Sequence, residues 1–163
     1  MLRRILVPLD GRRDGLAAVP ALRWLVGGTG AVVHLLAVRP QVRRPEHSGD
    51  RLIYLDELRL QERAHWLDYL TREASHLAYD GIVVQREVRF GDPLAETLAA
   101  AERHAMQLIV LAARPQTWLE RLWRPHLAQQ LLAHAAIPVL TVPAERPYWQ
   151  GVAVRYSAAT AQG

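Results

Sequence analysis

The sequence predicts an α/β fold: a parallel sheet covered by helices on both faces. Short apolar runs recur along the chain, segments of helix length separate them, and the runs are almost continuously apolar rather than alternating. Unbroken apolar strands are typical of parallel sheets buried on both faces, and strands that alternate with helices are typical of the α/β class. The expected strands are residues 5–9, 31–38, 81–88, 108–112 and 138–142.

The segment 52–79 predicts a long amphipathic helix, which Gly81 ends. Its apolar residues recur at a spacing of three and four, so they form one stripe along the helix. The stripe consists of Leu60, Ala64, Leu67, Leu70, Ala74 and Leu77. Between these residues lie charged side chains that we interpret as a solvated face paired with arginines. The carboxylates of that face are Asp56, Glu57, Glu62 and Glu73.

Three shorter helices complete the pattern. Residues 92–105 begin with Asp92 and a proline, which is an N-cap followed by proline at the first helical position. Residues 125–135 also begin with a proline. In the helix expected near 14–26, Pro20 lacks an amide hydrogen, which costs about 3 kcal/mol unless the helix begins late.

The composition excludes several classes of protein. All 20 basic residues are arginine, the net charge is +4, and cysteine is absent, which excludes disulfides and thiolate–metal sites. The apolar span 15–38 is broken by Pro20 and Arg23, so we expect no membrane helix there. MLRR is not followed by an apolar segment that ends in small residues, because Pro8, Asp10 and two more arginines come at once, so we expect no signal peptide.

Four motifs in order resemble the universal stress protein family: RRILVPLDG (3–11), HLLAVRP (34–40), VRFGDPLAETLAAAERHAMQLIVLAA (88–113) and LAQQLLAHAAIPVLTVP (127–143). The resemblance implies a doubly wound five-stranded parallel sheet of strand order 3-2-1-4-5. It also implies a homodimer formed through the last strand and a role in stress survival. The expected organisation is a domain at residues 1–143 and a C-terminal tail at residues 144–163.

Some members of that family bind ATP with a Gly-x2-Gly-x9-Gly-Ser/Thr loop after the fourth strand. At the corresponding positions this chain has Ala112, Pro115, Pro125 and His126. Side chains there restrict the approach of phosphates, and the two prolines have no N–H to donate. We therefore expect no ATP binding of the family type and no cofactor.

With that strand order, the ligand crevice lies at the carboxyl ends of the first and fourth strands. Arginines follow the strands there, which suggests a site for an anion or nucleotide. The candidate residues are Asp10, Arg12, Val38, Arg114, Arg124 and His126. Asp10 and Val38 also match positions that ATP-binding relatives use near the nucleoside. The alternative is that arginines such as Arg39 and Arg89 are solvated or paired with nearby acids, and that Asp10 has a local structural role.

Other chemistry finds no support in the sequence. The histidines make no His-x-x-x-His pair, so we expect no metal site, and no serine lies in a Gly-x-Ser-x-Gly motif, so we expect no catalytic residues. We interpret Trp24 and Trp66 as core or helix-packing residues, and Trp118 and Trp123 as candidates for a partner surface.

The leading hypothesis is a non-enzymatic, cytoplasmic homodimer that acts through protein contacts, including a regulatory protein partner, or through an anionic ligand. The alternative is a protein that binds ATP or AMP with arginines and hydrolyses it weakly at most. Nucleic-acid binding through the arginine pairs at 3–4, 12–13 and 43–44 is less favoured, and a membrane role is not expected.

Overall fold

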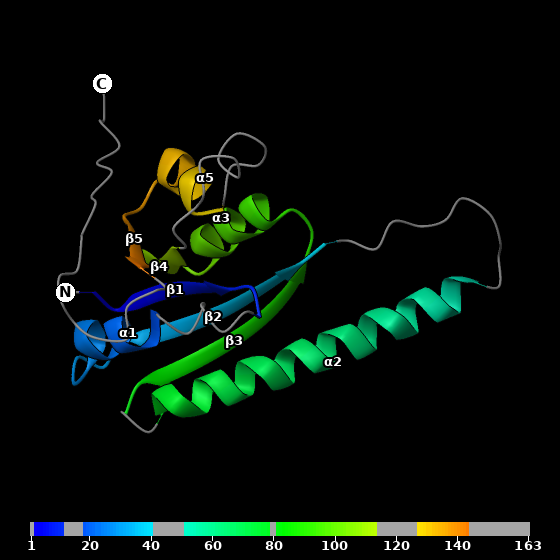
Figure 1. Cartoon of the computed structure of the whole chain (residues 1–163), viewed down its shortest axis with the longest axis horizontal. Coiled ribbons are helices and arrows are strands. Elements are labelled where there is room, and N and C mark those ends of the chain that lie inside the picture. The colour runs from blue at the N-terminus through cyan, green and yellow to red at the C-terminus, as the bar shows by residue number, and fades with distance from the viewer. Residues whose placement is uncertain (1, 12–17, 41–50, 79–80, 114–126, 144–163) are drawn as a thin grey trace.

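A computed structural model describes residues 2–11, 18–40, 51–78, 81–113 and 127–143. Five parallel strands form one sheet in the order β3-β2-β1-β4-β5 (Figure 1), which confirms the expected strand order. The strands are β1 (Arg4–Leu9), β2 (Val32–Arg39), β3 (Val83–Phe90), β4 (Leu108–Ala113) and β5 (Val139–Pro143). No helix in the described part of the chain is both long and apolar enough to cross a membrane.

Helices cover both faces of the sheet, as expected (Figure 1). They are α1 (Ala18–Val26), α2 (Arg51–Ala78), α3 (Pro93–Arg103) and α5 (Leu127–His134). One core lies between the sheet and α1 and α2, with Leu22, Leu70 and Leu77 fully buried. The second core lies on the opposite face beneath α3 and α5, where Ala100 and Leu131 are buried. Each core therefore combines one sheet face with two helices.

The proline of α1 lies near the start of its described part. Helix α1 is described from Ala18, and Pro20 is its third described residue; amide groups in the first turn of a helix have no partner within it, so a proline is tolerated there. The helix ends where expected, because the amide of Gly27 donates to the carbonyl of Arg23 and Gly28 adopts a φ of 73°.

The expected apolar stripe of α2 is only half correct. Leu70, Ala74 and Leu77 are buried, but Ala64 is exposed and Leu60 is 68% exposed. The reason is length: a helix of 28 residues extends about 42 Å, whereas the eight residues of β3 extend about 26 Å. The first turns of α2 therefore project beyond the sheet (Figure 1).

Strand β3 also departs from the expectation of strands covered on both faces. It lies at an edge of the sheet, and its side chains alternate between the α2 core and a polar face. Val84, Val88 and Phe90 contact the core, whereas Gln85 and Glu87 project from the opposite face, on the side of α3. This polar face becomes important for the site described below.

Candidate functional site

Two of the predicted crevice residues lie in the described part of the chain. Asp10 directly follows β1, and Val38 is the penultimate residue of the neighbouring strand β2. Both therefore lie at the carboxyl edge of the sheet, with Asp10 exposed and Val38 half-buried against the α3–α5 core. Residues outside the described ranges include Arg12, Arg114, Arg124 and His126, together with Trp118 and Trp123.

Trp66 of α2 covers the end of β1. Gly11 has a φ of 78°, and a Cβ atom at that position would overlap the indole ring of Trp66. Tyr69 packs edge-on against the same indole, with ring centroids 5.5 Å apart. The prediction that Trp66 is a packing residue is confirmed. The same prediction for Trp24 is wrong, because its side chain on α1 is 78% exposed.

Two arginines at the carboxyl edge are held by groups of the protein itself. The Arg39 Nε donates to Glu62 Oε1 over 3.1 Å, and its guanidinium lies 4.5 Å from the centre of the Trp66 ring. The Arg89 Nε donates to Glu96 Oε2 over 2.5 Å. For these two residues the self-paired alternative is therefore correct, with Glu62 and Glu96 as the partners.

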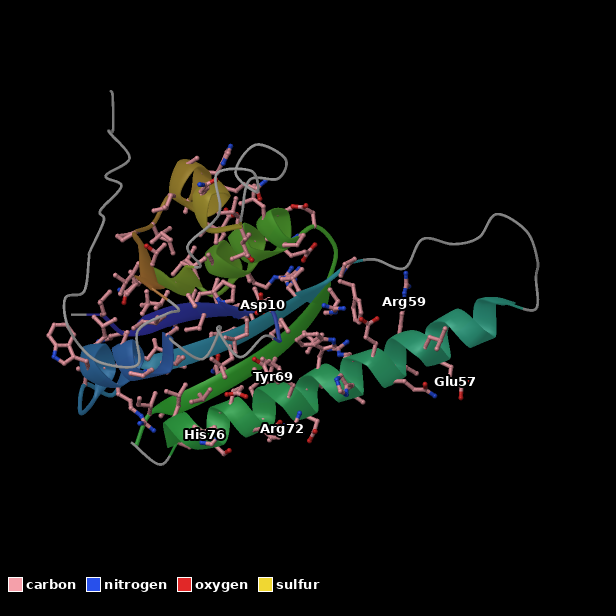
Figure 2. All side chains as sticks on the ribbon, in the orientation of Figure 1. Asp10, Glu57, Arg59, Tyr69, Arg72 and His76 are labelled. Atoms are coloured by element: carbon pink, nitrogen blue, oxygen red, sulfur yellow. The ribbon has the colours of Figure 1, made fainter. Side chains whose placement is uncertain are left out.

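Two side-chain oxygens on the inner face of α2 have no hydrogen-bond partner among the described residues. They are the Oη of Tyr69 and the Oε2 of Glu73, which lie one helical turn apart on α2 (Tyr69 is labelled in Figure 2). Burial, followed by the negative charges of Glu73 and Asp10, raises the pKa of Tyr69 to about 12. Burial also raises the pKa of Glu73, which is only 8% exposed. The prediction that Glu73 belongs to a solvated face is therefore wrong.

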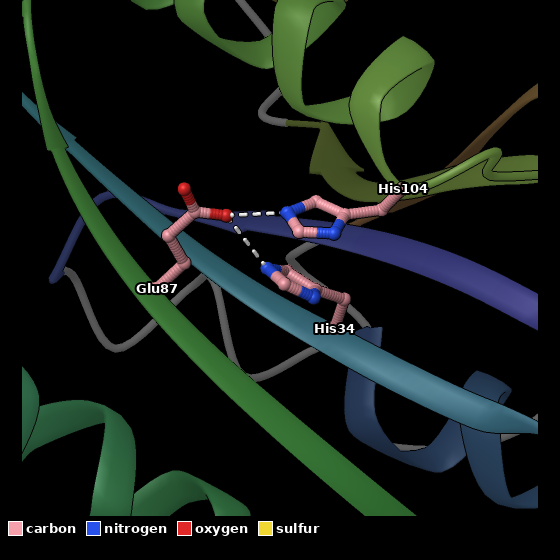
Figure 3. A group of neighbouring side chains, drawn as sticks. All are labelled: His34, Glu87 and His104. Carbon is pink, nitrogen blue, oxygen red and sulfur yellow. Dashed lines mark hydrogen bonds and ion pairs between the residues drawn. The ribbon is translucent and has the colours of Figure 1, made fainter.

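The structure brings together three side chains that the sequence analysis kept apart. His34 of β2 and His104, which follows α3, both direct their Nε2 atoms at one carboxylate oxygen of Glu87 on β3 (Figure 3). The distances to Glu87 Oε2 are 3.0 Å from His34 and 2.9 Å from His104. The imidazole rings lie 4.5 Å apart between centroids. We call these three residues the His–Glu–His cluster.

The two oxygens of Glu87 have different surroundings. Oε2 faces the two imidazoles, whereas Oε1 lies 3.5 Å from Arg89 Nη1 and 3.9 Å from Arg103 Nη1. Burial alone raises the pKa of Glu87, but hydrogen bonds with His104 and His34 and the charges of His34 and Arg89 outweigh it. The pKa of this carboxyl is therefore below its usual value, and the group is ionised at neutral pH.

The C-terminal turn of α3 fixes the position of His104. The amide of Met106 donates to Ala101 and that of Ala105 donates to Glu102, which is the hydrogen-bond pattern of a Schellman motif. Ala105 adopts a φ of 48°, a left-handed conformation that glycine usually occupies at this position. At the other end of α3 the expected N-cap is confirmed, because Asp92 Oδ1 accepts from the amide of Ala95.

The cluster could not be predicted from the spacing of its residues, because Glu87 is 53 residues from His34 and 17 residues from His104, and the three share no helix. One signal was present: a histidine within the apolar run AVVHLLAV lies in a buried strand and needs polar partners. His34 is indeed only 3% exposed. The strand register completes the signal, because His34 pairs with Gln85 on β3, which carries Glu87 two residues later on the same face.

The fold is shared with solved structures of universal stress proteins. UspA of Lactobacillus plantarum matches with a TM-score of 0.69 and 23% identity, over 86% of this chain and 97% of that one. A family member from Burkholderia pseudomallei matches with a TM-score of 0.61 and 24% identity, over 87% and 96%. A universal stress protein in complex with cAMP matches with a TM-score of 0.63 and 15% identity, over 88% and 98%.

No curated protein shows significant similarity to the chain. The sequence model of one family, the universal stress protein family, matches residues 1–143, which is most of the 163 residues and includes all five strands. The strand order, the helices on both faces and this match agree, so the chain belongs to the universal stress protein family.

Proposed function

We propose that the chain is a non-enzymatic universal stress protein that does not bind ATP in the manner of the family's glycine loop. The observation that carries this proposal is the composition of the segment after β4. Residues 112–126 contain no glycine, and Pro115 and Pro125 have no N–H to offer to a phosphate. The described edge supports it, because Trp66 covers the end of β1 and acidic side chains hold Arg39 and Arg89.

The working form we propose is a cytoplasmic homodimer that acts in the stress response through protein contacts, including a regulatory partner. Strand β5 lies at an edge of the sheet, and an edge strand presents backbone groups to which another strand can pair. Its five residues make it a short interface, so further contacts must contribute. Light scattering at micromolar concentration tests the assembly, and a monomer would contradict it.

The nucleotide test begins with the purified, tag-free protein. After denaturation, mass spectrometry of the released small molecules is expected to find no stoichiometric adenine nucleotide. Calorimetric titration with ATP and ADP is then expected to give no saturable binding below millimolar concentration. A stoichiometric bound ATP, or micromolar ATP affinity, would overturn the proposal.

A second candidate is an adenine monophosphate held by arginines. It is favoured by Asp10 and Val38, which both lie at the carboxyl edge, at the ends of the neighbouring strands β1 and β2, and one structural neighbour contains cAMP. A monophosphate needs fewer donors than a triphosphate, so arginines after β1 and β4 would suffice. Titration with AMP and cAMP tests it, with Asp10→Asn as the variant. Asp92→Asn is the matched control, because it changes charge equally and preserves an N-cap.

A further inference from the structure

We propose that the His–Glu–His cluster is a binding site for a divalent transition metal, best matched by Zn²⁺. Two imidazole nitrogens and one carboxylate oxygen converge from three different elements, and all three ligand atoms lie within 4.8 Å of one another. Such a set of two histidines and one carboxylate is a known protein ligand set for zinc, with a fourth position left for water or another group.

The distances are close to those that a metal requires. In a tetrahedral site with Zn–ligand distances near 2.0–2.1 Å, two ligand atoms lie about 3.3 Å apart. The two Nε2 atoms lie 3.0 Å and 2.9 Å from Glu87 Oε2 (Figure 3). Two of the three separations therefore need to grow by only a few tenths of an ångström, and the third, between the two Nε2 atoms, is within 4.8 Å.

The surroundings of the His34 Nδ1 atom favour metal binding at the Nε2 atom of the same ring. His34 Nδ1 lies 3.3 Å from Gln85 Oε1, which is a hydrogen-bond acceptor. A neutral imidazole carries one N–H, so it cannot donate both to Gln85 from Nδ1 and to Glu87 from Nε2. When a metal replaces the proton on Nε2, the one remaining N–H, on Nδ1, can donate to Gln85. Metal-bound histidines usually donate their other N–H to such an acceptor, which fixes the orientation of the ring.

Burial and charge favour an ion with nitrogen ligands. The His34 side chain is 4% exposed, so its ring is held in place, while those of Glu87 and His104 are 22% and 32% exposed and leave a route from solvent. Arg89 and Arg103 face Glu87 Oε1 and not the Oε2 atom that the imidazoles face, and Glu96 neutralises Arg89. Ca²⁺ and Mg²⁺ prefer shells made only of oxygen, so we expect neither to bind here.

The site is separate from the carboxyl edge. His34 is the third residue of β2, and His104 lies at the C-terminal end of α3, which runs back toward the amino ends of the strands. The metal would connect β2, β3 and α3. Its expected effect is therefore to stabilise α3 on the sheet, whether or not a nucleotide binds at the other edge.

The test uses the full-length, tag-free protein after treatment with a chelator. Calorimetric titration with Zn²⁺ is expected to show one ion per chain, and thermal unfolding is expected to shift to higher temperature with Zn²⁺ but not with Mg²⁺. Titration with Co²⁺ is expected to give the visible absorption of a four-coordinate ion. Absence of Zn²⁺ binding up to 100-fold excess over the protein would overturn the proposal and identify the cluster as a hydrogen-bonded group only.

Two variants assign the binding to the cluster. His104→Gln removes the most exposed ligand and is expected to weaken Zn²⁺ binding at least tenfold, whereas His65→Gln, which changes an exposed histidine of α2, is expected to leave it unchanged. Gln85→Ala keeps all three ligands and is expected to weaken binding about tenfold through the lost support of His34. Circular dichroism of each metal-free variant checks the fold. Binding as strong as in the wild type in both His104→Gln and Gln85→Ala would place the ion elsewhere and refute the assignment.

Discussion

The buried carboxyl of Glu73 is expected to destabilise the protein at neutral pH, so Glu73→Met is expected to increase its stability. Its Oε2 atom has no hydrogen-bond partner, and such a buried group costs about 1–3 kcal/mol. Methionine has a similar shape and a similar helix propensity, so the substitution removes the polar group with little change in packing. We expect a gain of about 1–2 kcal/mol, with the melting temperature rising about 2–4 °C for each kcal/mol.

The gain in stability from Glu73→Met is expected to depend on pH. Burial raises the pKa of Glu73 above its usual value of 4.5, so the folded state holds its proton to higher pH than the unfolded state does. The stability of the wild type therefore falls as pH rises from 4.5 through the folded pKa. The variant lacks this loss, so its advantage is expected to be larger at pH 7 than at pH 4.

Urea unfolding followed by circular dichroism, at both pH values, measures the difference. Glu57→Met is the matched control, because Glu57 is an exposed carboxylate on the same helix and its substitution is expected to change stability by less than about 0.5 kcal/mol. The prediction is contradicted if Glu73→Met does not raise the free energy of unfolding at pH 7, or if it raises it by the same amount at pH 4.

Three other predictions concern the described helices. Asp92→Ala is expected to lower the free energy of unfolding by about 1 kcal/mol because α3 loses its N-cap, whereas Asp92→Ser should retain most of it in the same urea assay. Ala105→Gly is expected to raise it by about 1 kcal/mol because glycine tolerates the φ of 48°, and a loss of stability would contradict the assigned turn. Ultraviolet titration is expected to show one of the five tyrosines ionising near pH 12, and Tyr69→Phe should abolish that step while leaving the others.

Local signals in the sequence were sufficient to predict the strands, whereas the strand order came from the resemblance to the family. The runs ILVPL, AVVHLLAV and LIVLA are short and apolar, and each forms a strand close to its expected bounds. The N-cap at Asp92 is equally local, since it depends on side-chain and backbone atoms three residues apart. Features that depend only on residues close in the sequence can therefore be predicted before the tertiary structure is known.

Two kinds of feature could not be predicted from the sequence: those that depend on the relative lengths of helices and strands, and those that depend on residues far apart in the chain. Leu60 satisfies the helical spacing, but it is exposed because α2 is longer than the sheet that it covers. Arg39 was expected at a ligand edge, yet a glutamate 23 residues away holds it, on a helix that packs back over the sheet. The carboxyl-edge candidates Arg12, Arg114, Arg124 and His126 lie outside the described residues and stay predictions.

Helix α3 connects the two regions considered for function. Near its start Glu96 pairs with Arg89, and at its end His104 contacts Glu87, two residues earlier on the same strand. The helix is therefore attached to one face of β3 at both ends, near the carboxyl edge and within the His–Glu–His cluster. A ligand at either end of α3 therefore contacts the same rigid element. By linkage, the factor by which Zn²⁺ changes the affinity of a ligand at the carboxyl edge must equal the factor by which that ligand changes the affinity for Zn²⁺. Titrating each ligand in the presence of the other measures that coupling, and equal affinities with and without the second ligand would show that α3 transmits nothing between them.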